Sequence, residues 1–235
     1  MATLRILSAG AAQAVTERII EAFERDTGND VVADFGAVGA MKARVTAGEP
    51  VDLIILTRAM IDELIAAKRV EDGTRFDLGR VGTGVAVRAG TPAPDVSGAD
   101  VLRKALLAAT TVVCPDPAIA TAGKVVMSLM DKLGVADEVR SRMQFFPNGY
   151  AAMSWLAASG GPGDLGITQV TEILPNKGVT YAGPLPAEFQ MKAVYSAGVA
   201  AKAAEAQLAT SFIGRFAGPS ARAMLAEAGY ELELS

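Results

Sequence analysis

Two turns of this chain combine small residues with the start of a helix, a pattern suited to binding an anion. The apolar run 4–7 passes into the small residues 8–12, and the stretch 35–45, FGAVGAMKARV, has the form of a strand, a tight turn and a helix. Glycine lets the backbone approach a ligand, and the first N–H groups of a helix are unpaired and lie at the positive end of its dipole. Two such turns at one sheet edge would form a binding site made of backbone. The residues assigned to it are Gly10, Ala11, Ala12, Val38, Gly39 and Ala40. Tight packing of small residues would explain either turn alone equally well.

The side chains that could do chemistry are limited, because the chain contains no histidine and one cysteine. Metal sites built on imidazole and acid–base catalysis by histidine are therefore excluded, and we expect no metal and no cofactor. Cys114 is interpreted as a buried apolar residue, since no histidine is available to activate it. Lys42, in the first turn of the second helix, and Arg58, after the third strand, could each place a positive charge at the site. Both could instead be solvated surface charges.

The elements that position these residues alternate between strand and helix. The opening pattern is βαβαβα, which predicts an α/β fold with a parallel, doubly wound sheet. Strands are predicted at 4–7, 31–35, 51–56, 81–88, 111–114, 143–146, 165–168 and 192–200. Helices are predicted at 13–26, 39–47, 59–70, 100–109, 123–133, 150–158, 203–216 and 220–228.

The order and spacing of the sequence motifs in this chain resemble those of the periplasmic molybdate-binding proteins. That family has a type II solute-binding fold of two α/β lobes around a ligand cleft. The resemblance covers nearly the whole chain and rests on ILSAGAAQAV, FGAVGAM, AGEPVDLIIL, CPDPAIATAGK, GDLGITQVTEIL and the GY near the end. It implies that each lobe is a doubly wound, mainly parallel sheet and that the chain crosses between the lobes near residues 81 and 192. Residues 1–81 and 192–235 would then form one lobe, and residues 82–191 the other.

Three departures from the family pattern bear on the ligand. The serines that donate to the oxyanion in the family are matched here by Ala11 and Val38, and a tyrosine of its second lobe is matched by Gln169. Losing a donor at a buried anion site costs about 1 to 3 kcal/mol, so we expect molybdate to bind weakly. The further contacts expected in the second lobe are the hydroxyl of Thr121, its neighbour Ala122, and the turn Asn148, Gly149 and Tyr150, whose backbone amides would face the cleft. Thr121 could instead be a helix N-cap.

A small organic anion, a di- or tricarboxylate, suits these residues better, because Gln169 offers a donor and an acceptor and arginine pairs well with carboxylates. One function is that of a solute-binding protein that closes about a hinge and serves a transporter permease. The alternative is a cofactor-free isomerase, since relatives of this fold include aconitate isomerase; Lys42 or Tyr150 would then be the catalytic proton carrier. An intracellular ligand sensor is a third possibility.

Composition limits the partners and the compartment. The net charge is −4 and no basic cluster is present, so nucleic acid and an anionic membrane surface are not expected as partners. No apolar run is long enough to cross a membrane, which argues against membrane insertion. The N-terminus lacks the pattern of an export signal, so we expect a cytoplasmic protein, or a periplasmic one if such a signal has been removed.

Overall fold

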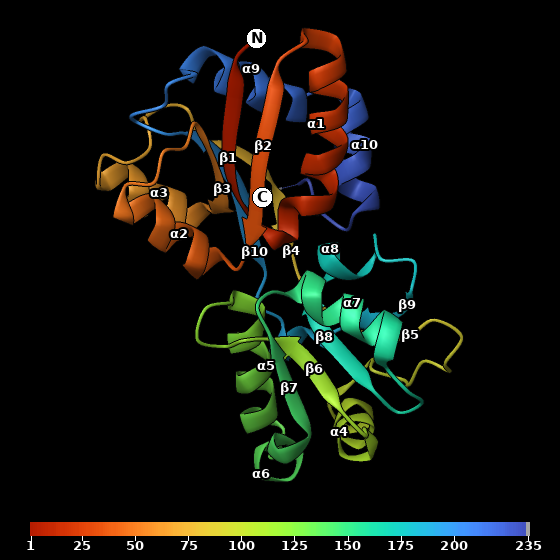
Figure 1. Ribbon diagram of the computed structural model, residues 1–235. Helices are drawn as coiled ribbons and strands as arrows, with labels where there is room; N and C mark the ends of the chain where they lie inside the picture. Colours follow the sequence, from red (N-terminus) through yellow and green to blue (C-terminus); the bar gives the residue numbers. More distant parts are fainter. Residues whose placement is uncertain (234–235) are drawn as a thin grey trace. The chain divides into compact units, whose positions relative to one another are not determined.

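The structure is a computed structural model that describes residues 1–233 (Figure 1). Contacts between residues divide the chain into two compact units. Unit 1 combines Met1–Val81 with the chain from Ala193 onward, and unit 2 is Gly82–Lys192. No helix of the described part of the chain is both long and apolar enough to span a membrane.

Unit 1 contains a five-stranded sheet with the order β2-β1-β3-β10-β4. Its strands are β1 (Thr3–Ala9), β2 (Asp30–Gly36), β3 (Leu53–Thr57), β4 (Phe76–Val81) and β10 (Ala193–Val199). Strand β1 pairs in parallel with β2 and β3, and β10 runs antiparallel to both β3 and β4. All five residues of β3 are buried, as expected for a central strand that is covered on both faces.

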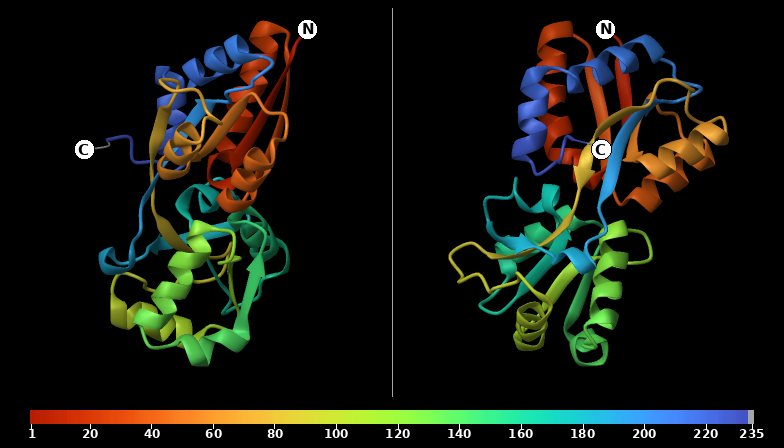
Figure 2. Two further views of the ribbon diagram at one scale, coloured as in Figure 1. Left: turned by 90° about the vertical axis from the view of Figure 1, so that its left-hand side faces the viewer. Right: turned by 180° about the vertical axis from the view of Figure 1, so that it is seen from behind.

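Helices cover both faces of this sheet (Figures 1 and 2). They are α1 (Gln13–Thr27), preceded by the 3-10 turn η1 (Gly10–Ala12), α2 (Val38–Ala47), α3 (Arg58–Ala66), α9 (Ala206–Phe216) and α10 (Pro219–Glu227). Helices α2 and α3 pack on one side, and α1, α9 and α10 pack together on the other. The ring of Phe23 in α1 meets that of Phe212 in α9 edge to face, with centroids 5.1 Å apart, which joins the two ends of the chain in one core.

Unit 2 repeats the plan with a five-stranded sheet of order β7-β6-β8-β5-β9. Strand β6 is parallel to β7 and β8, and β5 is antiparallel to β8 and β9. Each sheet therefore has three neighbouring parallel strands, then one reversed strand, and at its edge a fifth strand that is antiparallel to the reversed one. The strands are β5 (Thr83–Arg88), β6 (Val112–Pro115), β7 (Met143–Phe146), β8 (Leu165–Gln169) and β9 (Val179–Pro184). The helices are α4 (Ala99–Ala108), α5 (Thr121–Lys132), α6 (Ala136–Val139), α7 (Gly149–Ser159) and α8 (Val170–Ile173), with 3-10 turns η2 (Arg140–Arg142) and η3 (Ala187–Phe189).

Alternation along the strands of unit 2 separates two apolar layers. Val85 and Val87 of β5 face the layer that contains α4 and α5, whereas Ala86 faces the layer that contains α7 and α8. Cys114 lies in the first layer, and burial raises the pKa of its thiol to about 12. The interpretation of Cys114 as a buried apolar residue is confirmed.

Most predicted helices and strands are present with shifted ends. Three predictions differ from the structure for physical reasons. The predicted strand 81–88 corresponds to β5, which begins at Thr83, whereas Val81 is the last residue of β4, a strand of the other unit that the sequence prediction did not include. The predicted helix 59–70 ends at Ala66, just before Lys68 adopts a left-handed conformation with φ of 54°. The sequence pattern does not predict β9, because its Gly183 and Pro184 are typical of a loop.

Candidate anion-binding site

The carboxyl ends of β1, β2 and β3 form one edge of the unit 1 sheet, because these strands are neighbours and parallel. A helix follows each strand: η1 and α1 after β1, α2 after β2, and α3 after β3. The N-cap residues of η1, α2 and α3 are Ala9, Ala37 and Thr57, and none of their side chains accepts a hydrogen bond from the helix that follows. The first N–H groups of these helices therefore have no side-chain acceptor at their N-caps, the condition under which a helix start can bind an anion.

The two predicted turns, at the starts of η1 and α2, follow neighbouring strands at this end of the sheet. Ala9 and Gly36 are partners in the β1–β2 ladder, so η1 and α2 begin at the same level of the sheet. The carbonyl of Ala11 accepts a hydrogen bond of 3.0 Å from the Tyr230 hydroxyl, which fixes η1 to the end of the chain. The structure thus brings together the predicted residues of this lobe: Gly10, Ala11 and Ala12 form η1, and Val38, Gly39 and Ala40 form the first turn of α2. Their contact with a ligand stays a prediction.

Lys42 is the fifth residue of α2, and so lies beyond the first turn in which the sequence pattern places it. Its ammonium forms an ion pair with Glu63 of α3. The charge is therefore compensated on the surface of two helices. This contact does not favour Lys42 as a binding or catalytic residue.

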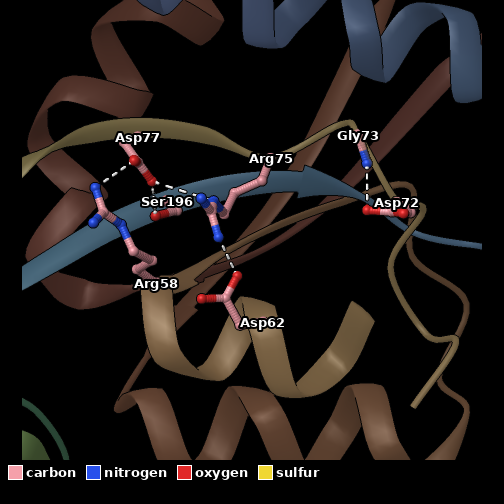
Figure 3. Close-up of polar contacts among 7 residues, drawn as sticks. All are labelled: Arg58, Asp62, Asp72, Gly73, Arg75, Asp77 and Ser196. Atoms are coloured by element: carbon pink, nitrogen blue, oxygen red, sulfur yellow. Dashed lines mark hydrogen bonds and ion pairs between the residues drawn. The ribbon is translucent and has the colours of Figure 1, made fainter. Parts of the chain in front are cut away.

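Arg58 is the first residue of α3 and binds the carboxylate of Asp77 on β4 (Figure 3). The second oxygen of Asp77 accepts a hydrogen bond of 2.6 Å from the Ser196 hydroxyl on β10 and lies 3.7 Å from Nε of Arg75. Burial alone would raise the pKa of Asp77, but Ser196 and Arg58 hold it below its usual value. Arg58 thus links α3 to the sheet, and its charge is already balanced.

In unit 2 the corresponding strands β6, β7 and β8 are followed by α5, α7 and α8. Helix α5 begins at Thr121, and its N-cap residue Ala120 makes no side-chain hydrogen bond. Thr121 is therefore the first helical residue rather than the N-cap, and Ala122 behind it is buried. A Cβ on Gly123 would lie 2.4 Å from the carbonyl oxygen of Pro115, so only glycine lets α5 begin this close to the end of β6.

The start of α7 differs, because its N–H groups are used within the protein. Asn148 is the N-cap and accepts a hydrogen bond of 2.8 Å from Ala151 N–H. The carboxylate of Glu172 in α8 accepts hydrogen bonds from the Thr168 hydroxyl, at 2.6 Å, and from the backbone N–H groups of Gly149, Tyr150 and Gln169. The amides of Gly149 and Tyr150, which the sequence predicts to face a ligand, thus have Glu172 as an acceptor within the protein, and their contact with a ligand stays a prediction.

Glu172 is only 4% exposed. Burial raises the pKa of Glu172 to about 7, although the hydrogen bonds from Thr168 and the backbone oppose this rise. The site requires glycine at position 149, since a Cβ there would lie 1.9 Å from both Glu172 Oε2 and Thr168 Oγ1. The signal in the sequence is a single acidic residue within the otherwise uncharged run ITQVTEIL, and our sequence prediction did not include it.

Gln169, the last residue of β8, is 2% exposed, and neither atom of its side-chain amide has a hydrogen-bond partner among the described residues. Opposite it in the β5–β8 ladder is Thr83, which is fully buried and whose hydroxyl also lacks a partner there. Gln190 holds the backbone of Thr83 in place, with hydrogen bonds of 3.0 Å and 2.7 Å. Buried polar groups are normally paired, so two adjacent unpaired ones indicate a place for a ligand or a water. The sequence pattern gives no indication of Thr83.

No group of three or more cysteine, aspartate and glutamate residues within 1–233 is placed to hold a metal ion. The groups described above offer hydrogen bonding and electrostatics. Unit 1 has helix N-termini without a side-chain cap, and unit 2 has a buried carboxyl group and, separately, unpaired amide and hydroxyl groups.

Two α/β units of this topology define a two-lobed protein of the type II periplasmic binding fold. The chain belongs to the family of bacterial extracellular solute-binding proteins, whose model matches residues 4–231.

Known relatives agree with this assignment. Aconitate isomerase of Pseudomonas sp is 25% identical over 236 residues, which cover 97% of this chain and 87% of that protein. The periplasmic molybdate-binding protein of Azotobacter vinelandii has a TM-score of 0.82 and 24% identity, covering 98% of this chain and 99% of the other. A sulfate-binding protein of Mycobacterium tuberculosis has a TM-score of 0.73 and 20% identity, and the match covers 98% of this chain and 86% of that protein. At these identities the structural likenesses establish the fold alone.

Proposed function

We propose that this protein is a solute-binding protein for a small organic anion, a di- or tricarboxylate. The observation that carries the proposal is the set of neighbouring helix starts at the edge of the unit 1 sheet that lack a side-chain cap. Backbone N–H groups and helix dipoles at such an edge balance negative charge without a mobile cation. Membership in a solute-binding family supports this use of the site.

The residues at the two turns favour a carboxylate over a compact tetrahedral oxyanion. Ala11 and Val38 have no hydroxyl to donate, so an oxyanion would be bound by backbone groups alone. The unpaired amide of Gln169 suits an organic molecule that carries both donors and acceptors. Similarity to an aconitate isomerase, whose named substrate is a tricarboxylate, points to the same class of ligand.

A panel of anions tests the proposal through thermal stability. trans-Aconitate, citrate and succinate are compared with molybdate, sulfate and phosphate, followed by calorimetry on any anion that raises the melting temperature. A ligand present at 100 times its Kd should raise the free energy of unfolding by about 2.7 kcal/mol. Stabilisation by the carboxylates is expected. Stabilisation by the tetrahedral anions alone would overturn the proposal.

A second candidate function is a cofactor-free isomerase that shifts a proton on an unsaturated tricarboxylate. The observation that favours it is the aconitate isomerase relative, whose similarity extends over 97% of this chain. Incubation with cis-aconitate and with trans-aconitate separately would test it, since an isomerase brings both to the same ratio. Lys42 and Tyr150 are the proposed proton carriers, although the ion pair with Glu63 weakens the case for Lys42. Measuring the isomerase activity of the variants Lys42→Met and Tyr150→Phe would show which of the two residues carries the proton.

For the solute-binding function, we further propose a transporter permease as the partner and a periplasmic location. Both rest on the family, which is described as extracellular and solute-binding, and on structural neighbours that are periplasmic or substrate-binding components of transporters. Fractionation of cells that express the full-length gene product would test the location.

A further inference from the structure

We propose that unit 1 has a second anion site, which binds a small molecule that carries a phosphate group. The site is a cavity of about 250 Å³, and its lining includes three basic residues, Lys68, Arg69 and Lys202. The volume is just below the roughly 300 Å³ at which pockets for drug-sized ligands begin, so the ligand must be small. This site is additional to the carboxylate site of the proposed function.

The cavity lies at the end of the unit 1 sheet that is opposite the helix starts described above. Val51 of its lining comes just before β3, and Ala200 comes just after β10. The N–H group of Ala200 donates to the carbonyl of Asp52 at 2.9 Å, which joins these two segments. The cavity is therefore at the amino end of β3, whereas the uncapped helix starts follow the carboxyl ends of β1, β2 and β3. A ligand in the cavity would not compete with one bound at those helix starts.

The three cations of the cavity lack acidic partners. Lys68, Arg69 and Lys202 form no ion pair within the part of the chain that the structure describes. The acidic side chain of the lining, Glu49, is already engaged by Arg44, whose Nε donates to it at 2.7 Å. The chain as a whole has a net charge of −4, so three unpaired positive charges around one cavity make a local region of positive potential, which attracts anions.

The backbone of Lys68 gives a second, independent indication. Helices α1 and α2 end at the left-handed glycines Gly28 and Gly48, with φ of 70° and 87°. Just after α3 the same conformation falls on Lys68, with φ of 54°, the one positive φ that a residue other than glycine has within 1–233. A lysine pays a steric cost for this conformation that glycine does not. Such strain is typical of residues whose side chains have a function.

Capping of the helix end does not account for these basic side chains. In the last turn of α3, the carbonyl of Ile65 already accepts the N–H group of Lys68 at 2.9 Å. The carbonyl of Leu64 likewise accepts the N–H group of Arg69 at 2.8 Å. The guanidinium of Arg69 donates to the carbonyl of Thr46 in α2 at 3.3 Å, and its other N–H groups have no acceptor among the described residues. These N–H groups are available to an anion.

A phosphate group suits this set of donors. Ammonium groups of lysine bind phosphate as point charges, and the guanidinium of arginine presents two parallel N–H groups to its oxygens. A phosphate ester carries a charge of about −1.5 to −2 at pH 7, whereas one carboxylate carries −1. In a small cavity, a phosphate group therefore balances more of the charge of the three cations than a carboxylate does.

Inorganic pyrophosphate is the probe, and its Kd is measured by calorimetry on the full chain at physiological ionic strength. The parent should bind it at one site with a Kd below about 1 mM. Lys68→Gly and Lys202→Gln should each weaken binding by about fivefold or more, as expected for the loss of one ion pair. Lys104→Gln removes one charge from an exposed lysine of unit 2 and is the matched control. It should change the Kd by less than about twofold.

Lys68→Gly also separates a binding role from a structural one. Glycine adopts the left-handed conformation without the steric cost, so the melting temperature of the free protein should rise by about 2 °C. Weaker pyrophosphate binding by a variant that is more stable than the parent cannot be due to unfolding. It must come from the loss of the ammonium group.

No binding of pyrophosphate by the parent at about 10 mM would overturn the proposal, as would an unchanged affinity in Lys68→Gly or Lys202→Gln. An equal loss in Lys104→Gln would also overturn it, because the attraction would then be to the overall charge. Citrate is measured on the same variants. A loss of citrate affinity in Lys68→Gly as large as that for pyrophosphate would contradict the assignment to phosphate. The panel of anions that tests the proposed function is decided separately, since the helix starts lie at the other end of the sheet.

Discussion

The hydroxyl of Thr168 donates a hydrogen bond of 2.6 Å to the carboxylate of Glu172, four residues later in the chain. Thr168 lies near the end of β8 and Glu172 lies within α8, so the bond closes the turn between them. The same carboxyl group accepts N–H groups from the start of α7. Glu172 therefore joins one strand and two helix starts through a single buried group, and its ionisation should affect stability.

The first prediction concerns pH. The pKa of Glu172 in the folded protein is about 7, above its usual value of 4.5, so the folded state binds the proton more tightly than the unfolded chain. This contribution to stability is fully present below pH 4.5 and is lost as the pH rises through 7. Urea unfolding of the parent at pH 5 and pH 8 should therefore show a loss that Glu172→Gln lacks, on the order of 3 kcal/mol. Parallel pH profiles for the two proteins would contradict this origin.

The second prediction concerns Gly149. Gly149→Ala would place a Cβ within 1.9 Å of Glu172 Oε2 and Thr168 Oγ1, so the carboxyl group must leave its donors. We expect the free energy of unfolding to fall by about 2 kcal/mol or more, since buried donors are then left unpaired. Gly214→Ala in α9 is the matched control, because nothing lies within 4 Å of a Cβ at that position. The control should raise stability by about 1 kcal/mol, as alanine does inside a helix.

The sequence carries enough information for the fold but less for the site. Apolar runs such as Leu53–Thr57 and the small residues at η1 and α2 predict strands, turns and helices, because burial and helix starts impose local patterns. The sequence pattern does not indicate a special role for Glu172 or Thr83. Their roles depend on contacts with α7 and β8 that are made only in the folded chain, and no local pattern separates them from ordinary polar residues.

The third prediction concerns specificity for tetrahedral anions. Ala11→Ser combined with Val38→Ser adds a hydroxyl at each of the two turns that leave the unit 1 sheet side by side. Each new donor should contribute about 1 kcal/mol to the binding of an oxyanion, so molybdate affinity should rise by tenfold or more for the pair. Calorimetry with molybdate on the parent and the double variant measures the gain. Sub-micromolar binding of molybdate by the parent would contradict the prediction, because backbone groups would then bind the oxyanion tightly without the two hydroxyls.

The last prediction concerns Lys42. Because its ammonium is paired with Glu63, Lys42→Met should change the affinity for trans-aconitate by less than about twofold at physiological ionic strength, where exposed charges are screened over about 8 Å. The free energy of unfolding should fall by less than about 1 kcal/mol, which is typical of a surface ion pair. Glu63→Gln is the control, since it removes the partner and leaves the lysine free. A Lys42→Met variant that loses tenfold or more in affinity would mean that the pair opens when the ligand binds, and would return Lys42 to the binding site. If Glu63→Gln also binds more tightly than the parent, the two carboxylates, that of Glu63 and that of the ligand, compete for the same ammonium group.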